Sequence, residues 1–394
     1  MMNPQSRIYL DNAATSWPKP EAVYRAVEHY QRELGASPAR GIYAESVEVD
    51  QTIDAARAAA ARLIGAEQPE RIVFTLNGSD SLNLAIHGLL RDGDHVVTSV
   101  VDHNSVLRPL RWLEERGRIS VTRVHCGADG VVDPDSLAAA MRTNTRLVAL
   151  VHASNVTGAL QPVEEAGRIA HEHGALMLVD AAQSLGHVPI AVGQMNVDLL
   201  AAPGHKGLMG PVGTGILYIR PGVEREIESL RQGGTGTHSD EDRQPDSLPD
   251  KYEPGNLNAL GIFGLHAALH WLGERTVEAI RRHAEELTTR MIEGFSSIRG
   301  VRVYGPCDAE RQVGVVSITI PGYSPAEVAT ILEGHYRVQV RAGIHCAPLM
   351  HESLGTLVRG GTVRFSLGPF TTAEEIDTAV RAVGEITTAH VELV

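Results

Sequence analysis

The sequence predicts an α/β protein built on a mainly parallel sheet that helices cover on both faces. Short apolar runs alternate with helical segments from about residue 50 to residue 220, and some runs, such as residues 147–152, are almost continuously apolar. Strand–helix alternation and continuous apolar strands are both typical of parallel sheets buried on two faces. The length of 394 residues exceeds one small domain, so we expect a large domain with a smaller companion.

Each expected element of the first half follows from the spacing of its apolar residues. Helices show a helical period of apolar residues, and strands are short apolar runs that end at a polar residue or a glycine. The first of these helices is rich in alanine and is stopped by Gly65. The expected helices are residues 50–64, 81–90, 106–115, 135–141 and 163–171. The expected strands are residues 72–75, 95–100, 121–124, 147–152, 175–180, 199–202 and 215–219.

The alternation is interrupted by residues 232–255, which are rich in Gly, Asp and Pro. We expect a long excursion there, because long ordered loops in compact domains are usually functional or contact a partner. Two long helical patterns follow at 257–272 and 276–298, and then a second α+β set. Its expected strands are 301–304, 314–320, 338–341 and 362–366, and its expected helices are 325–333 and 373–387. The predicted division is a terminal arm with a large domain, 1–258, and a smaller domain, 259–394.

Composition excludes several classes of function. A net charge of −13 argues against binding to nucleic acid or to anionic membranes. No apolar stretch has the length of a membrane helix, and the first ten residues lack a signal-peptide core, so we expect a cytoplasmic enzyme. The three cysteines, Cys126, Cys307 and Cys346, share no CxxC spacing, and there is no HExxH motif. We therefore expect neither a disulfide framework nor a metal site.

Two segments carry the most chemical information. Lys206 lies in a glycine-rich run, residues 202–211, and Asp180 ends the apolar run 175–180. An uncrowded amine can form a Schiff base, and a carboxylate at a strand end can keep a ring nitrogen protonated. Together they are the minimal protein equipment for chemistry with pyridoxal phosphate.

A phosphate group would fit the turn between the strand 72–75 and the next helix. Gly78 and Ser79 lie in this turn, where free backbone N–H groups and the positive end of the helix dipole favour an anion. An ordinary helix cap is the alternative, since Ser79 and Asp80 are both good capping residues.

Polar residues also follow the other predicted strands. His103 follows the strand 95–100, Asn155 and Thr157 follow 147–152, and Gln183 follows Asp180. Ligands of open α/β sheets bind beyond the carboxyl ends of the strands, so these side chains are expected to converge. Taken singly, each of them could instead satisfy local backbone groups.

The smaller domain contributes two further candidates. Cys346 follows Arg341 and His345, which could lower the thiol pKa, although a small inert thiol is the alternative. Arg364 lies inside a predicted strand, where a substrate carboxylate could pair with it. An internal ion pair with Asp or Glu is the alternative for Arg364.

These motifs, in this order, resemble the class V aminotransferase family of fold-type I pyridoxal phosphate enzymes, and within it the cysteine desulfurase and selenocysteine lyase branch. The resemblance runs nearly end to end. It rests on residues 9–15, 40–42, 102–103, 152–158, 178–183, 204–206, 252–258, 341–346 and Arg364. It implies a seven-stranded sheet in the large domain and a homodimer with its sites near the subunit interface.

The resemblance also implies roles for single residues. Lys206 would form the Schiff base, His103 would stack on the cofactor ring, and Asp180 would pair with the ring nitrogen. Asn155 and Gln183 would address the phenolic oxygen and the imine. Gly78, Ser79 and His205 would hold the phosphate, and Thr235 or Thr237 would reach the phosphate of the partner subunit. Arg364, with Asn155 and Arg341 nearby, would bind the substrate carboxylate, and Cys346 would accept sulfur.

Some positions depart from the family pattern. Pro203 stands where many desulfurases have a hydroxyl residue that contacts phosphate, and the phosphate turn contains Asn-Gly-Ser-Asp in place of Gly-Thr-Thr-Glu. The cysteine segment is short and contains Pro348, which resembles the branch with a compact cysteine loop and a sulfur-accepting partner.

The resemblance implies a transferase that converts L-cysteine to L-alanine. Lys206 would move the α-proton, Cys346 would take the sulfur as a persulfide, and sulfur transfer to an acceptor protein or a small thiol would follow. A selenocysteine lyase, a C–S lyase or an aminotransferase on the same scaffold is the first alternative. A non-enzymatic relative is the second.

Overall fold

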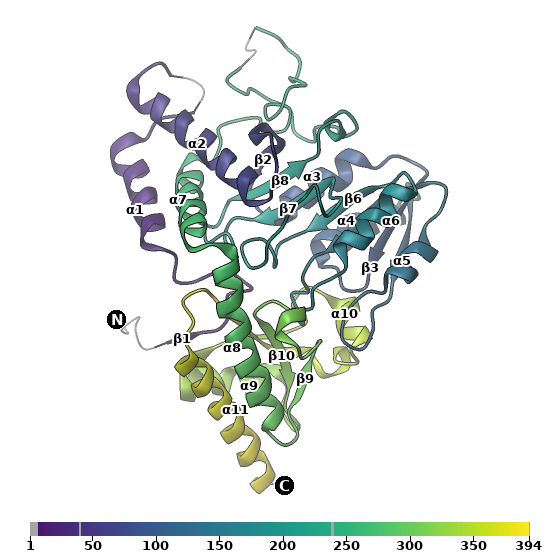
Figure 1. The fold of residues 1–394 in the computed structure, drawn as a ribbon, viewed down its shortest axis with the longest axis vertical. Helices are drawn as coiled ribbons and strands as arrows, with labels where there is room; N and C mark the ends of the chain where they lie inside the picture. Colours follow the sequence, from purple (N-terminus) through teal and green to yellow (C-terminus); the bar gives the residue numbers. More distant parts are fainter. Residues whose placement is uncertain (1–6, 39–40, 238–239, 394) are drawn as a thin grey trace.

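The computed structural model describes residues 7–38, 41–237 and 240–393, except for the side chains of residues 390–393. Arg40, from the motif at residues 40–42, lies outside the described residues. The described chain forms an upper α/β body and a lower, smaller body, joined by the long helix α8 (Val277–Ser297) (Figure 1). No helix in this part of the chain is long and apolar enough to cross a bilayer.

A seven-stranded sheet forms the centre of the large domain, as predicted. Its strand order is β2-β8-β7-β6-β5-β3-β4. Only β8 runs against its neighbours; the other neighbouring pairs are parallel. The strands are β2 (Ile72–Thr75), β3 (Asp94–Ser99), β4 (Ile119–Val124), β5 (Thr145–Val151), β6 (Leu176–Asp180), β7 (Leu199–Pro203) and β8 (Gly215–Ile219).

Successive side chains of each central strand enter two different cores. In β6, Leu176 and Leu178 belong to one apolar cluster, whereas Met177 and Val179 belong to another. Side chains alternate between the faces of a strand, so burial of both sets explains the continuous apolar runs. The first face is covered by α3 (Gly78–Leu89) and α4 (Asn104–Glu115). The second is covered by α2 (Ala44–Leu63), α5 (Pro134–Ala140), α6 (Val163–Glu172) and α7 (Ala259–Arg275).

The smaller domain has an antiparallel sheet of order β12-β13-β10-β9. Its strands are β9 (Arg302–Tyr304), β10 (Val315–Thr319), β12 (Arg341–Gly343) and β13 (Thr362–Ser366). Buried residues of α8 and α11 (Ala373–Leu393) pack on this sheet in a third apolar cluster. Its remaining helices are α9 (Pro325–Ile331) and α10 (Pro348–Ser353).

The predicted strand 338–341 is wrong as one element. The chain forms β11 (Val338–Gln339), which pairs with β1 (Ile8–Tyr9), and then β12, which pairs with β13. The strand therefore changes sheets at Val340. The short elements β1, α1 (Glu21–His29) and α10 were not predicted.

The division at residue 258 stays a prediction, and the packing argues for a later boundary. Helix α7 lies against α1 and α2 and contributes Ile262 and Leu265 to the core of the large domain. The core of the smaller domain instead contains Leu10 from the N-terminal arm. By packing, the boundary falls near Thr276, between α7 and α8.

The predicted excursion contains no helix or strand among its described residues and projects as a loop at the top of Figure 1. Its far end is fixed by a buried ion pair. Arg57 of α2 and Glu253 form two hydrogen bonds of 2.8 Å, and Glu253 also accepts the backbone N–H of Phe74 in β2. The excursion is therefore anchored to the strand that leads into the turn at Gly78.

Candidate active site

A cavity of about 360 Å³ opens at the carboxyl ends of the central strands. Eight of the nine predicted cofactor residues line it, and the ninth, Thr237, does not. The eight are Gly78, Ser79, His103, Asn155, Asp180, Gln183, His205 and Lys206, and the other lining residues are Asn77, Leu82, Ser105, Val151, Ala182 and Pro203. The predicted convergence of strand-end side chains is therefore confirmed for His103, Asn155, Asp180 and Gln183, whereas Thr157, which was also expected here, does not line the cavity.

The turn before α3 is a capped helix N-terminus that faces the cavity. Asn77 accepts the backbone N–H of Asp80 through its side chain (2.9 Å). The Asp80 carboxylate turns back to the N–H of Leu76 (3.0 Å) and does not line the cavity. The N–H groups of Gly78 and Ser79 stand in the first turn, where a helix has no internal acceptor for them. This end of the cavity suits an anion.

His103 is held as a neutral imidazole. It caps α4, and its Nδ1 accepts the backbone N–H of Ser105 (3.0 Å), so the proton of the neutral ring belongs on Nε2. Burial, reinforced by the nearby Lys206 ammonium, lowers the His103 pKa to about 4. The Ser105 hydroxyl joins the Ser79 hydroxyl at 2.6 Å, which links α4 to the turn at α3.

Burial disfavours the charged forms of both Lys206 and Asp180, whereas each residue favours the charged form of the other. Burial lowers the Lys206 pKa to about 8, against the opposing pull of Asp180. Burial also raises the Asp180 pKa, while the Ala182 N–H (2.9 Å) and Lys206 favour its carboxylate form. Lys206 follows β7 and Asp180 ends β6, and the parallel register of these strands brings the two residues to one edge. The site thus holds an amine that loses its proton more readily than an ordinary lysine.

Buried polar atoms in the cavity wall are left without a protein partner. Asn155 Oδ1 and His205 Nδ1 are both buried and unpaired. Gln183 donates its amide to the carbonyl of Ala13 (2.9 Å). Unpaired buried polar atoms are costly, so such atoms in a cavity wall indicate a polar ligand. A helix N-terminus, a depressed-pKa lysine and a buried carboxylate fit the phosphate, carbonyl and ring nitrogen of pyridoxal phosphate.

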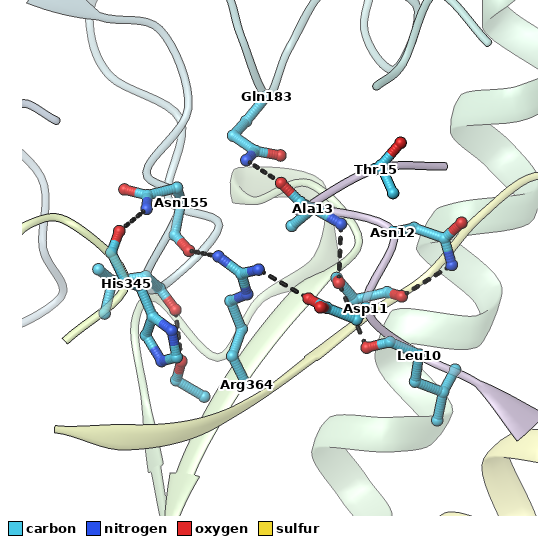
Figure 2. A network of polar contacts seen from close by, with 12 residues as sticks. Leu10, Asp11, Asn12, Ala13, Thr15, Asn155, Gln183, His345 and Arg364 are labelled. Carbon is cyan, nitrogen blue, oxygen red and sulfur yellow. Dashed lines mark hydrogen bonds and ion pairs between the residues drawn. The ribbon is translucent and has the colours of Figure 1, made fainter. Parts of the chain in front are cut away.

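Arg364 is buried in β13 beside this cavity. It donates from Nη1 to the carbonyl of Asn155 (3.0 Å) and from Nη2 to Asp11 Oδ1 (2.9 Å), and its Nε is buried without a partner (Figure 2). The predicted alternative, an internal ion pair, is thus present, and the Nε donor is left without a protein partner. Arg341 lies opposite Arg364 across the β12–β13 ladder and is exposed.

Cys346 is exposed and lines a second, adjoining cavity of about 660 Å³. Ser79, His103 and Ser105 line both cavities. His345 and Cys346 have φ values of 51° and 60°, in the left-handed region that non-glycine residues rarely adopt. Hydrogen bonds hold this turn: Asn155 donates its amide to the carbonyl of His345, and the N–H of Asn104 donates to the carbonyl of Cys346 (2.8 Å). The cysteine turn is thereby fastened to Asn155 in the wall of the first cavity and to Asn104 in the wall of the second.

The profile described as Aminotransferase class-V matches residues 8–379, which is nearly the whole chain. The chain belongs to the class V aminotransferase family.

Several proteins that this chain resembles are named cysteine desulfurases, and the solved structures among them share its fold. A probable cysteine desulfurase of Methanothermobacter thermautotrophicus is 39% identical over 386 residues, covering 97% of this chain and 95% of the relative. One from Pyrococcus abyssi is 35% identical, covering 97% and 94%. The solved cysteine desulfurase of Thermococcus onnurineus matches with a TM-score of 0.92 at 34% identity, covering 98% and 96%. The TM-score with a cysteine desulfurase of Escherichia coli is 0.87 at 29% identity, covering 97% and 95%.

Thr237 does not line the cavity that contains Lys206. It belongs to the excursion, donates its hydroxyl to Asp250 (2.7 Å) and lines a separate hollow formed by residues of the excursion itself. Its predicted reach to the phosphate of a partner subunit stays a prediction.

Sequence reasoning assigned no role to three residues that shape the site. Ser105 joins Ser79 to His103, and Asp11 pairs with Arg364. Asp102 is fully buried, and burial raises its pKa to about 6; its carboxylate ties the end of β3 to the N–H of Val151 in β5 (2.6 Å). A signal existed for Asp102, since a carboxylate directly after an apolar strand must find partners.

Proposed function

We propose that this chain is a pyridoxal phosphate-dependent cysteine desulfurase that converts L-cysteine to L-alanine. The observation that carries the proposal is the placement of Cys346 at a cavity that shares three wall residues with the cavity of Lys206, Asp180 and His103. The names of the relatives support the substrate. The two cavities supply an amine for proton transfer and an accessible thiol for sulfur capture, which are the two functions that the reaction requires.

Different residues of the cavity would bind different parts of the cofactor. The first turn of α3, with Gly78, Ser79 and the unpaired Nδ1 of His205, would hold the phosphate. The Asp180 carboxylate would keep the ring nitrogen protonated, and neutral His103 would cover the ring. Pyridoxal phosphate, when bound, supplies the electron sink that stabilises negative charge at the substrate α-carbon.

The reaction then uses two side chains of this chain. Lys206, whose pKa of about 8 makes a free amine available near neutral pH, takes the α-proton of the substrate. The Cys346 thiolate attacks the substrate sulfur, the bond between Cβ and sulfur breaks, and a new S–S bond forms on Cys346 Sγ. Arg364 holds the substrate carboxylate, with Asn155 and Arg341 nearby. The persulfide sulfur passes from Cys346 to an acceptor protein or a small thiol.

Product analysis tests this proposal directly. Purified holoenzyme with L-cysteine and a reductant should form alanine and sulfide in equal amounts. Cys346→Ala should lose both products, whereas Cys307→Ala, which removes another exposed thiol, should keep them. Pyruvate in place of alanine would identify a C–S lyase. Undiminished alanine from Cys346→Ala would exclude the persulfide step.

Two further features belong to the same proposal. The enzyme is a homodimer, as the family resemblance implies, and sedimentation of the holoenzyme tests this. It acts in the cytoplasm, where reducing conditions favour the free form of a thiol such as Cys346.

A further inference from the structure

The Arg364 side chain is held firmly in place by its neighbours, although it is proposed to bind a ligand. The residue is 2% exposed, and its two terminal nitrogens donate to opposite sides, one to the Asn155 carbonyl and the other to Asp11. Among the described residues, Asp11 is the acidic side chain that forms an ion pair with this guanidinium. A guanidinium is planar, so two contacts at its opposite nitrogens fix the direction of its plane.

The residues on either side of Asp11 are held from both halves of the molecule. On the side of the smaller domain, the N–H of Ser366 donates to the carbonyl of Leu10 (2.7 Å), and the N–H of Ala13 donates to the Ser366 hydroxyl (2.9 Å). On the side of the large domain, the Gln183 amide donates to the carbonyl of Ala13 (2.9 Å). In Figure 2, Asp11 lies between Leu10 and Ala13 along the chain, and the Arg364 guanidinium lies between Asp11 and Asn155.

This arrangement leaves a defined part of Arg364 for a ligand. Asp11 accepts through Oδ1 at Nη2, and Nε of Arg364 is buried with no partner. A buried donor without an acceptor is costly until a ligand satisfies it. Without Asp11, the guanidinium would lose its one acidic partner and the contact that opposes the pull of Asn155, and its plane would be free to turn.

We propose that Asp11 is the positioning residue that aims Arg364 at the carboxylate of the amino acid, and that it thereby sets the preference for ligands that carry this carboxylate. The inference rests on the proposed function and deepens it. Asp11 acts through Arg364, so its removal should affect ligands with a carboxylate and spare those without one.

The test compares L-alanine, the expected product, with L-alaninol, in which a hydroxymethyl group replaces the carboxylate. Affinities of the holoenzyme for both ligands are measured by calorimetric titration. A hydrogen bond to a charged group is strong enough that Asp11→Ala should weaken L-alanine binding by on the order of tenfold or more. Binding of L-alaninol should change by less than about twofold. Asp11→Asn keeps an acceptor oxygen at the same place, so its L-alanine affinity should stay within about threefold of wild type.

Kinetics supply a second readout. With L-cysteine, Asp11→Ala should raise KM by a factor similar to the loss of L-alanine affinity and leave kcat within about threefold. An equal loss for L-alanine and L-alaninol, or unchanged L-alanine binding, would overturn the inference. If Asp11→Asn lost as much L-alanine affinity as Asp11→Ala, the inference would also be overturned. The charge of Asp11, and not its orientation of the Arg364 guanidinium, would then be the cause.

Two provisions keep the test decisive. If Asp11→Ala fails to fold, Asp11→Ser replaces it, because serine keeps a polar group in the arm but is too short to reach Nη2. If wild-type enzyme forms no alanine from L-cysteine, the proposed function fails, yet the ratio of L-alanine to L-alaninol affinity still decides whether Asp11 aims Arg364.

Discussion

Lys206 carries a positive charge that the folded protein disfavours. Its pKa falls from 10.5 to about 8 on burial, so between these pH values the unfolded chain binds this proton more tightly than the folded chain. The charged Lys206 therefore destabilises the cofactor-free fold below about pH 8, and this penalty disappears as the pH rises toward 10.5. The amine needed for proton transfer is thus obtained at a cost in stability.

This gives a prediction for the cofactor-free protein. Lys206→Met should raise the free energy of unfolding at pH 7 by about 1–2 kcal/mol, and the gain should shrink toward zero at pH 10. Urea denaturation at the two pH values measures it. Lys251→Met is the control, since the Lys251 ammonium donates to the carbonyl of Glu224 (2.7 Å) and its loss should not stabilise the fold. A gain that is equal at both pH values would contradict the explanation.

The sequence predicted the site residues whose local sequence context is unusual, and it missed those whose context is common. A lysine among glycines and a carboxylate that ends an apolar strand are unusual, and both lie in the cavity. Ser105 resembles any serine in the first turn of a helix, and its link to Ser79 depends on the spacing of α3 and α4. Asp11 was visible in a motif, but its partner Arg364 comes from a strand 353 residues away.

At the scale of elements, the contact between α3 and β7 determines the shape of the phosphate end. A Cβ atom added to Gly78 would lie 3.1 Å from Cδ and 3.3 Å from the backbone N of Pro203. Pro203 has no N–H to offer a phosphate, but it lets α3 begin closely against the end of β7. Any side chain at the first residue of α3 would press against Pro203, so glycine suits this close approach.

We therefore expect Gly78→Ala to damage both packing and binding. The free energy of unfolding should fall by about 1–3 kcal/mol through overpacking, and affinity for pyridoxal phosphate should fall with it. Gly273→Ala is the matched control: a Cβ atom there meets nothing within 4 Å, and alanine in α7 should stabilise by up to about 1 kcal/mol. Chemical denaturation and cofactor titration measure these effects. Unchanged cofactor affinity in Gly78→Ala would argue against this turn as the phosphate site.

The anchor between α2, β2 and the excursion gives a second prediction at this scale. Arg57 and Glu253 are both almost fully buried, and Glu253 also accepts the N–H of Phe74. Replacing one partner leaves a buried charge unpaired, so Glu253→Gln should cost about 3–5 kcal/mol. The exposed pair Arg111–Glu115 is the control, and Glu115→Gln should cost less than about 1 kcal/mol. Equal costs at the two pairs, measured by denaturation, would show that burial is not the deciding factor.

The elements themselves were largely predictable, and the exceptions have physical reasons. Apolar runs located every strand of the central sheet, and the pattern is clearest where both faces are buried, as in β5, β6 and β7; the edge strand β4 is only half-buried. Direction leaves no such mark, so nothing in the run at β8 revealed that it lies antiparallel. The change of sheets at Val340 was hidden because β11 and β12 together resemble one strand. Helix α7 was assigned to the smaller domain by its place in the sequence, whereas its apolar face packs on α1 and α2.

For the molecule as a whole, the cavity makes cofactor and fold interdependent. Side chains from α3, α4 and the ends of β5, β6 and β7 meet there, so a bound ligand links elements across the large domain. Pyridoxal phosphate at 100 times its dissociation constant should stabilise the cofactor-free protein by about 2.7 kcal/mol. Thermal denaturation at increasing cofactor concentration measures this.

The matched ligand is pyridoxal, which lacks the phosphate. It should raise the melting temperature less than pyridoxal phosphate at equal concentration, since the first turn of α3 would have no anion to bind. Equal stabilisation by the two compounds would remove the phosphate role of Gly78 and Ser79.

The attachment of Asp11 to Arg364 has a consequence for the order of assembly during synthesis. Asp11 leaves the ribosome 353 residues before Arg364. The core around Lys206 draws nearly all of its residues from the chain up to α7, and the later members are few: Ile280, Val313, Val315, Ala347 and Met350. Most of the large domain can therefore fold while the smaller one is still being made. A contact of such sequence separation closes late, because the entropy of the intervening chain must first be lost. The half of the site that holds the cofactor is thus complete before the half that selects the amino acid, and a nascent chain cannot act on substrate until its final strand is in place.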